Sequence, residues 1–202
     1  MEEAKLINAA QKGDMQAFNQ LVLVYQEVVY NCAYRMLSDP AGAADITQDT
    51  FITSFQNIKK FRDGSFKAWL LRVATNKCID EFRRQKRHPN TALEPVTEDD
   101  DTFDSPYWLT DPQLQPEEQI SQNELNRAIQ DCLSNLPEDF RTIVVMVDMQ
   151  EMNYDEASQI SSLPLGTIKS RLSRARRRLQ DCLQRFSELL PSQFRFNQEE
   201  QS

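Results

Sequence analysis

The chain has few of the residues from which metal centres are built. Among its 202 residues there is one histidine, His88, and the cysteines are too widely spaced to form any CxxC pair. This composition argues against a structural zinc site, and we expect neither a metal nor another cofactor. The four cysteines each fall within a helical pattern, so we expect them to be buried free thiols. They are Cys32, Cys78, Cys132 and Cys182.

Long apolar segments are also missing. The run Leu21–Val24 is far too short to span a bilayer, and the N-terminus opens with acidic residues, so we expect no signal peptide. We therefore expect no membrane insertion and a cytoplasmic location. Glycine is scarce, with four residues, and alternating β-branched runs are short. Nearly every long segment has helical periodicity instead, which predicts an all-α protein.

The formal net charge of -8 conceals blocks of opposite sign. From Lys59 to Arg87 there are ten Lys or Arg residues against three acids, whereas Pro89 to Ile120 holds nine acids and no Lys or Arg. The second block also has five prolines and few aliphatic residues, so it cannot bury enough apolar surface to fold alone. We predict two small helical domains joined by a flexible acidic linker. The expected bounds are 1–88 and 123–190 for the domains, 89–122 for the linker and 191–202 for a tail.

The N-terminal domain is predicted to contain four helices. Asp14 can cap the second, Asp39-Pro40 can open the third, and Ser65 can cap the fourth after a loop at Phe61–Ser65. Apolar periodicity sets the expected extents. These are Leu6–Gln11, Asp14 to about Leu37, a third helix from Pro40, and Phe66 to about Arg87.

The C-terminal domain is predicted to contain a helix-turn-helix. A helix from about Pro116 to Leu133 and a second from Leu136-Pro137 are expected to precede it. The segment Tyr154–Leu179 then reads as a short helix, a Pro/Gly turn and a strongly basic helix, with Asn153 and Glu156 as a capping box. In such a motif the second helix enters the DNA major groove.

The basic helix has an apolar face and a basic face. At about 100° per residue, one stripe is apolar and can pack on a core. That stripe consists of Ile168, Leu172, Ala175 and Leu179. Between Leu165 and Arg178 there are six Lys or Arg residues and no acid, whereas a merely solvated helix face usually alternates its charges. The segment therefore predicts DNA binding.

Three segments in this order resemble a bacterial sigma factor of the extracytoplasmic-function (ECF) class, group IV of the primary sigma family. They are Asp45–Phe51 (DITQDTF), Phe66–Arg84 (FKAWLLRVATNKCIDEFRR), and Leu136–Arg141 (LPEDFR) with the helix-turn-helix that follows it. A helix-turn-helix alone is weakly specific, but all three segments at this spacing are highly specific. The resemblance implies a protein that binds core RNA polymerase and directs promoter-specific initiation, and not an enzyme.

The resemblance also implies roles for the N-terminal domain. Its third helix would dock on the clamp of the largest polymerase subunit through Asp45, Gln48 and Asp49, although Gly42 and Ala44 replace acidic residues that are common in the family. The fourth helix and the loop before it would recognise and melt the −10 element, with Asn76 lining a pocket for a flipped base. The implied −10 contacts are Phe61, Phe66, Arg72, Asn76, Lys77, Arg83 and Arg84.

The basic helix would read the −35 element as duplex DNA. The implied contacts are Lys169, Ser170, Arg171, Ser173, Arg174 and Arg177. Arg171 and the cluster Arg176–Arg178 are expected to contact phosphates. The implied partners are core RNA polymerase, through its clamp and flap, and promoter DNA. ECF factors are also commonly held inactive by an anti-sigma factor, but the sequence does not show whether one exists here.

Three other hypotheses for the function of the chain stay open. A stand-alone helix-turn-helix regulator explains the C-terminal domain but leaves the paired acids and the long basic helix of the N-terminal domain unexplained. A DNA-cleaving enzyme using Asp45, Asp49 and Asp80 as metal ligands has no HxxE motif, and its only DxD pattern, Asp99–Asp101, falls in the linker. A purely protein-binding role leaves the six clustered basic residues unexplained.

The linker length bears on mechanism. Promoter elements about two turns apart lie roughly 70 Å from each other. A linker of 34 residues averages about 30–35 Å when relaxed and reaches about 110 Å when extended. We therefore expect polymerase to hold the domains apart and the free protein to bind promoter DNA poorly. We also expect the acidic linker to screen the basic faces in the free protein.

Overall fold

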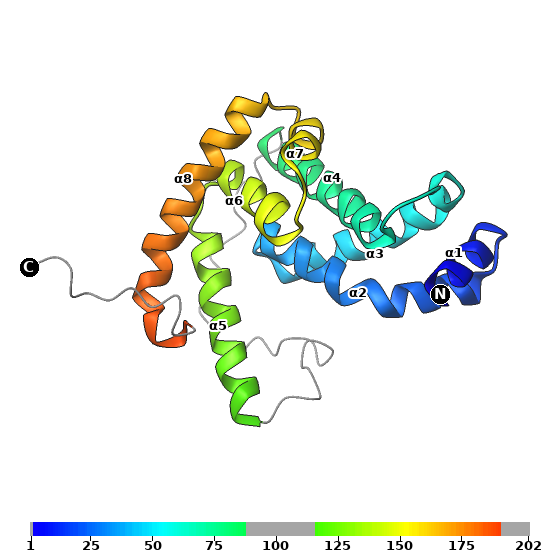
Figure 1. Ribbon diagram of the computed structural model, residues 1–202, viewed down its shortest axis with the longest axis horizontal. Helices are drawn as coiled ribbons and strands as arrows, with labels where there is room; N and C mark the ends of the chain where they lie inside the picture. The colour runs from blue at the N-terminus through cyan, green and yellow to red at the C-terminus, as the bar shows by residue number, and fades with distance from the viewer. Residues whose placement is uncertain (1, 88–115, 191–202) are drawn as a thin grey trace, which may run out of the picture.

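The computed structural model describes residues 2–87 and 116–190, and every regular element in those ranges is helical (Figure 1). This confirms the all-α class. The α-helices are α1 (Glu2–Gln11), α2 (Met15–Leu37), α3 (Pro40–Asn57), α4 (Phe66–Arg87), α5 (Pro116–Ser134), α6 (Glu138–Val144), α7 (Tyr154–Ser161) and α8 (Leu165–Leu183). Three short helical segments are η1 (Ile58–Lys60), η3 (Val145–Met149) and η4 (Gln184–Leu189). Among the described helices, none is long and apolar enough to cross a membrane.

Side-chain caps set the starts of the N-terminal helices. The Asp14 carboxylate accepts hydrogen bonds from the backbone N–H groups of Gln16 and Ala17, at 2.9 and 3.1 Å. The Asp39 carboxylate caps α3 in the same way, and Ser65 Oγ accepts from the Ala68 N–H at 3.2 Å at the start of α4. These three predicted starts are confirmed. Only α1 differs, because it begins at Glu2 and not at Leu6.

Helix α2 organises the N-terminal domain. It packs against α1, α3 and α4, and α3 also packs against α4. The core is formed by apolar side chains at helical spacing, of which Leu21, Met36 and Phe66 are fully buried. Val22, Tyr25 and Val28 on the same helix are half-buried and pack at the edge of this core.

Helix α8 organises the C-terminal domain. It packs against α5, α6, α7 and η4. Its predicted apolar stripe faces the core, with Ile168, Leu172 and Ala175 buried and Leu179 half-buried. The capping box at the start of α7 is present, since the Asn153 side chain accepts from the Glu156 N–H at 2.9 Å. The predicted helix-turn-helix is therefore confirmed.

The two domains lie against each other. Helices α5 and α6 contact α2, and α7 contacts α4 (Figure 1). The buried apolar residues of both domains form one continuous cluster. From the sequence we expected separate domains, and this interface was not predicted. Most of the predicted linker, and with it the expected screening by its acidic residues, lies outside the described residues.

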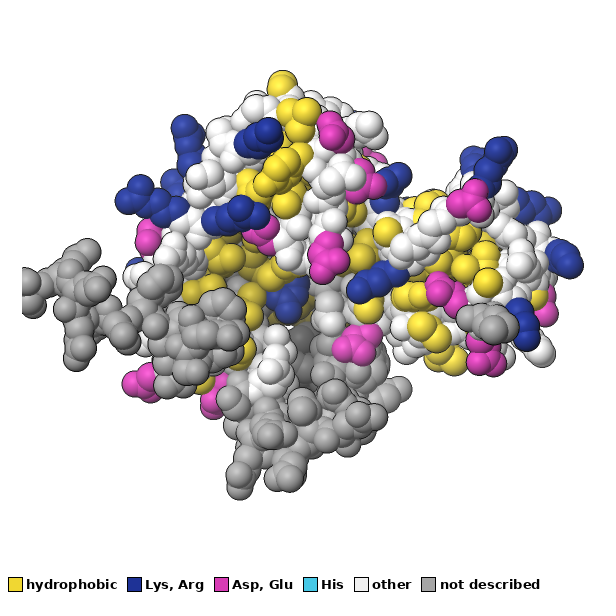
Figure 2. Space-filling view, viewed as in Figure 1, with side chains coloured by type: hydrophobic (Ala, Val, Ile, Leu, Met, Phe, Trp, Pro, Cys, Tyr) yellow, Lys and Arg dark blue, Asp and Glu magenta, His cyan; other side chains and the backbone are white. Residues whose placement is uncertain are grey.

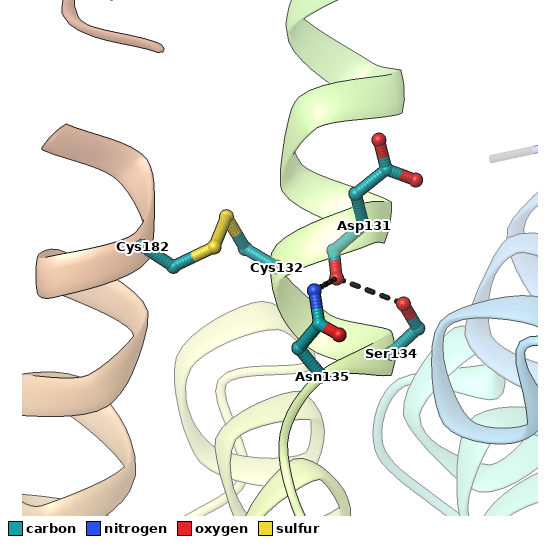
Figure 3. The surroundings of a disulfide bond; sticks show 5 residues. All are labelled: Asp131, Cys132, Ser134, Asn135 and Cys182. Atoms are coloured by element: carbon teal, nitrogen blue, oxygen red, sulfur yellow. Dashed lines mark hydrogen bonds between the residues drawn. A yellow bond between two sulfur atoms is a disulfide. The ribbon is translucent and has the colours of Figure 1, made fainter. Parts of the chain in front are cut away.

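The cysteines do not all behave as predicted. Cys32 and Cys78 are buried free thiols, as expected. Cys132 and Cys182 instead form a disulfide that joins α5 to α8, with Cα atoms 5.7 Å apart (Figure 3). The prediction of four free thiols is therefore wrong for this pair. A separation of 50 residues in sequence does not reveal that two helix ends meet in space.

Candidate nucleic-acid interface

The outer face of α8 is exposed and basic. Figure 2 shows several Lys and Arg side chains on the side of the molecule that α8 occupies in Figure 1, and others at the opposite end. Five of the six predicted −35 contacts lie on this face and are exposed. They are Lys169, Ser170, Ser173, Arg174 and Arg177. The Lys169 ammonium also lies 5.8 Å from the centre of the Tyr154 ring, a cation–π contact that ties it to α7.

Two other arginines of α8 are engaged within the protein. The Arg171 guanidinium is half-buried and forms an ion pair of 2.9 Å with Asp139 of α6. Arg176 donates two hydrogen bonds to the Asp148 carboxylate of η3, at 2.9 and 2.5 Å. Arg171 was expected to contact a phosphate, yet in this arrangement it holds α8 to α6. A charge pattern along one helix cannot show which acids on other helices will pair with it.

The predicted −10 residues of α4 are mostly on its surface. Asn76, Arg83 and Arg84 are exposed, and the two arginines pair with acids three residues earlier on the same helix, at 3.1 and 2.8 Å. Exposed pairs of this kind contribute about 0–1 kcal/mol, so their arginines can exchange the acid for a phosphate. Lys77 is more enclosed, and its ammonium lies 3.4 Å from the Asp49 carboxylate of α3.

Phe61 and Phe66, two of the predicted −10 contacts, are buried. Their side chains are 9% and 2% exposed. The two rings pack edge to face with centres 5.4 Å apart, and Trp69 lies against both, at 5.6 and 5.5 Å. An aromatic residue beside a loop can stack on a base or fill a core, and here Phe61 and Phe66 fill the core. Their packed rings anchor the loop 61–65 and are not exposed in this structure. Trp69 is half-buried at the edge of this cluster.

Helix α3 presents an acidic face beside an apolar groove. Asp45, Gln48 and Asp49 are all exposed on this helix. A groove of about 800 Å³ runs between α2 and α3, and Gln48 lines it. Its apolar lining includes Met15, Phe18, Val22, Phe51, Ile52 and Phe55. Met15 and Ile52 are 53% and 48% exposed, which leaves apolar surface open to a partner.

The glycine at position 42 has a local explanation. Asp39 Oδ2 accepts a hydrogen bond from the Gly42 N–H at 3.0 Å to cap α3. A Cβ at position 42 would lie 2.7 Å from that same oxygen. Replacing Gly42 with the acidic residue common in the family would therefore displace the cap. Ala44 has no such constraint in the structure.

The interface between the domains contains polar side chains with specific partners. Gln130 of α5 donates to the Tyr34 carbonyl oxygen at 3.3 Å and to Ser38 Oγ at 3.1 Å. The buried Arg141 of α6 also donates to Ser38 Oγ, at 2.7 Å. Buried polar groups must be paired, so these bonds favour one relative placement of the domains. We call this placement the closed arrangement.

Two further contacts link α4 to the C-terminal domain. Gln150 accepts a hydrogen bond from Thr75 Oγ1 at 3.1 Å and donates to Cys32 Sγ at 2.7 Å. The Arg72 guanidinium, a predicted −10 contact, is paired with Glu156 of α7. In the closed arrangement, part of the predicted −10 surface is therefore occupied by the first helix of the helix-turn-helix.

Replacing Gln130 with alanine is expected to loosen the closed arrangement. The change removes two hydrogen bonds, each contributing about 1 kcal/mol, so the open-to-closed ratio should rise by roughly 5- to 30-fold. Small-angle X-ray scattering of the free protein would detect this as a larger radius of gyration. Gln122→Ala, at an exposed position of the same helix, is the matched control and should leave the radius unchanged. An unchanged radius in both variants would show that Gln130 does not hold the domains together.

Two comparisons with known proteins identify the family. Residues 21–88 match the family described as Sigma-70 region 2, and residues 126–179 match Sigma-70, region 4. The chain is 33% identical to the ECF RNA polymerase sigma factor SigW of Bacillus subtilis, covering 87% of this chain and 93% of SigW. It is 32% identical to the ECF RNA polymerase sigma-E factor of Haemophilus influenzae, covering 91% of this chain and 96% of that protein.

Solved structures share the fold. The sigma factor RpoE of Bartonella quintana, in complex with the anti-sigma factor NepR, has a TM-score of 0.57 at 26% identity, covering 84% of this chain and 98% of RpoE. CnrH, in complex with the cytosolic domain of CnrY, has a TM-score of 0.54 at 21% identity, covering 91% of this chain and 97% of CnrH. The second likeness concerns the fold alone.

These matches decide which of the alternatives left open by the sequence is correct. The DNA-cleaving reading finds no support in the geometry either, because Asp49 pairs with Lys77 and Asp80 with Arg83. The two matched regions coincide with the two helical domains, and the relatives are covered over almost their whole length. The chain belongs to the ECF RNA polymerase sigma factors, with sigma regions 2 and 4, and is a non-enzymatic factor that directs transcription initiation by RNA polymerase.

Proposed function

We propose that this sigma factor reads the −35 element with α8, melts and reads the −10 element with α4, and docks on core polymerase through α3. One observation carries the proposal. Helix α8 buries three of the four residues of its apolar stripe and leaves Lys169, Ser170, Ser173 and Arg174 exposed on the opposite side. A recognition helix needs this division, because one face must hold the fold while the other enters the major groove.

The −35 reader combines two kinds of contact. Arg174 is long enough to form a bidentate pair with the O6 and N7 acceptors of a guanine, whereas the hydroxyls of Ser170 and Ser173 accept several bases. Lys169 and Arg177 flank them and supply charge for phosphates, which sets affinity but not sequence preference. Arg171 contributes indirectly, by fixing α8 against Asp139.

The −10 reader depends on Asn76 and on the loop before α4. Asn76 is exposed on α4, and its amide offers both a donor and an acceptor to the edge of a flipped base. Phe61 and Phe66 support this reader from beneath, because their buried rings fix the loop. Arg72, Lys77, Arg83 and Arg84 supply positive charge for the single strand.

Asn76→Ala is expected to impair promoter melting without loss of polymerase binding. Unstacking a base costs a few kcal/mol, and losing the amide that offsets part of this cost should lower open-complex formation by about 10-fold or more. Permanganate reactivity of unpaired thymines in the holoenzyme complex measures melting. Lys67→Ala, at another exposed position of α4, is the control and should melt normally. Normal melting by the Asn76 variant would remove the pocket role.

The polymerase surface is proposed to be the acidic face of α3 together with the apolar groove. Asp45 and Asp49 lie one turn apart and would meet basic residues of the clamp, while the groove beside Gln48 would take apolar side chains. Asp49 is already paired with Lys77, at 3.4 Å. Clamp binding would therefore release Lys77 toward DNA. We propose the flap as a second polymerase contact, made by region 4.

Promoter binding is proposed to require opening of the closed arrangement. The two readers must span roughly 70 Å along DNA, whereas here their domains are in contact and Arg72 is held by Glu156. Core polymerase, by binding the two domains at separate places, would supply the free energy for opening. The free protein should therefore bind promoter DNA poorly.

An anti-sigma factor is proposed as a further partner. The RpoE structure, 26% identical to this chain, contains the anti-sigma factor NepR. A protein that stabilises the closed arrangement, or covers the groove between α2 and α3, would keep this sigma factor from polymerase. We propose that all these events take place in the cytoplasm.

A further inference from the structure

We propose that Cys132 and Cys182 form a reversible modification site, which exchanges with low-molecular-weight thiols and disulfides and thereby sets the stability of region 4. The two residues lie in the last turns of α5 and α8 (Figure 3). Their Cα separation of 5.7 Å falls within the range of about 4.4–6.8 Å at which a disulfide forms without backbone movement.

Contacts other than the disulfide also hold the two helix ends. Helix α5 packs along α8 and η4. Its last turn is closed by Ser134 Oγ and Asn135 Nδ2, which both donate to the Asp131 carbonyl oxygen, at 2.8 and 2.9 Å (Figure 3). Cys132 is therefore presented to Cys182 by a formed helix end, and re-oxidation after reduction needs no refolding.

The other two cysteines are expected to be unreactive. Cys32 is 5% exposed and Cys78 fully buried, and neither forms a disulfide. Burial raises the pKa of Cys32 to about 12 and the pKa of Cys78 further. Both are thus protonated at neutral pH, and the reactive species in thiol exchange is the thiolate. Redox chemistry is therefore expected to be confined to Cys132 and Cys182.

The unequal burial of the pair sets the order of the exchange. Cys132 is 1% exposed, whereas Cys182 is half-buried. In reduction, a small thiolate attacks Cys182 Sγ, the protein S–S bond breaks, and Cys132 leaves as a thiolate that takes up a proton. A second small thiolate then attacks the mixed disulfide, which releases a small disulfide and leaves Cys182 as a thiolate that is also protonated. Two electrons and two protons thus pass to the protein, and oxidation by a small disulfide is the reverse.

The disulfide closes a loop that contains most of the helix-turn-helix. The two cysteines are 50 positions apart in sequence, and the segment between them includes α6, α7 and nearly all of α8. Closing a loop of this length restricts the unfolded chain, so the oxidised form of region 4 should be the more stable. The link from this stability to −35 reading rests on the proposed function of α8, whereas the stability change itself does not.

The bond is compatible with both arrangements of the domains. Gln130, which holds α5 to α2, precedes Cys132 by two residues, so the two side chains project from opposite sides of α5. Helix α5 thus binds region 2 on one side and α8 on the other. Oxidation would therefore stabilise region 4 without locking the domains together.

The test uses the full chain in glutathione buffers of graded redox ratio. Free thiols are alkylated after denaturation and counted by intact mass. We expect four labelled cysteines in strongly reducing buffer and two in oxidising buffer, with Cys32 and Cys78 labelled in both. The melting temperature of the oxidised form should be higher by about 10 °C or more. Slower amide hydrogen exchange in α8 would assign the gain to region 4.

Two variants make the result specific. Cys182→Ser should have the same melting temperature in both buffers, near that of the reduced protein. Cys78→Ala should keep the full redox shift. Four labelled thiols in the oxidising buffer, a bond that survives the most reducing buffer, or a melting temperature that ignores redox state would each overturn the proposal. None of these readouts uses DNA or polymerase, so failure here is distinguishable from failure of the proposed promoter-reading function.

Discussion

Leu172→Ala is expected to destabilise region 4 by about 2–5 kcal/mol and to abolish −35-dependent initiation. Leu172 is 2% exposed and lies at the centre of the apolar stripe of α8, between Ile168 and Ala175. Truncation removes its contacts and leaves a cavity that the surrounding helices cannot close. Because small domains are only about 5–15 kcal/mol stable, this loss is a large share of the total.

Urea unfolding of the full chain, followed by circular dichroism, measures the change in the free energy of unfolding. Leu165→Ala is the matched control, because Leu165 is on the same helix but 39% exposed. The control should change stability by less than about 0.5 kcal/mol. Equal losses of unfolding free energy in the two variants would mean that the stripe is not the packed face of α8. The division of the helix into a core face and a DNA face would then be wrong.

Arg174→Ala is expected to lower initiation from promoters with the preferred −35 element by about 1–3 kcal/mol, or roughly 5- to 150-fold. The reason is that Arg174 is exposed on the DNA face of α8 and can form a bidentate pair with a guanine. The discriminating quantity is the ratio between the preferred promoter and promoters altered at single −35 positions. That ratio should collapse at one position and persist at the others.

Arg178→Ala provides the comparison for Arg174. Arg178 lies one turn after Arg174 on α8, and its guanidinium lies 5.0 Å from the centre of the Phe140 ring. Its loss should weaken binding to all DNA sequences about equally and reduce the salt dependence. Run-off transcription with reconstituted holoenzyme measures both variants. If Arg174→Ala also lowered every promoter by the same factor, Arg174 would be a phosphate contact and base reading would belong to other residues.

Features with a local sequence cause were predictable. Helix starts at Asp14, Asp39, Ser65 and Asn153 follow from side chains that cap the backbone within three residues. The burial of one stripe of α8 follows from its period in the same way. Such features depend on neighbours along the chain, so the sequence contains the whole of their cause.

Features that depend on distant partners were not predictable. Gln130 and Gln150 look like ordinary surface residues in sequence, yet each bridges segments about 75–118 residues apart in the closed arrangement. The Cys132–Cys182 bond and the Arg171–Asp139 pair have the same origin. In each case a polar or sulfur atom finds its partner only because the helices pack, and the packing is not encoded in any local motif.

For the aromatic −10 residues, one sequence pattern is compatible with two different roles. Aromatic side chains beside a loop can stack on bases or fill a core, and the pattern is the same for both roles. The structure places Phe61 and Phe66 in the core and leaves Asn76 on the surface. The proposed −10 reader is therefore smaller than the sequence predicts, and it relies more on the Asn76 amide and the surrounding positive charge.

Reconstitution with core RNA polymerase tests whether the chain directs promoter-dependent initiation. The purified full chain is mixed with bacterial core enzyme and promoter templates, and complex formation and run-off transcripts are measured beside DNA binding by the chain alone. If the chain acts as a sigma factor, we expect a stable complex with core enzyme, transcripts only when the chain is present, and weak promoter binding without polymerase. Tight, sequence-specific DNA binding by the chain alone, together with no complex and no transcripts, would contradict it.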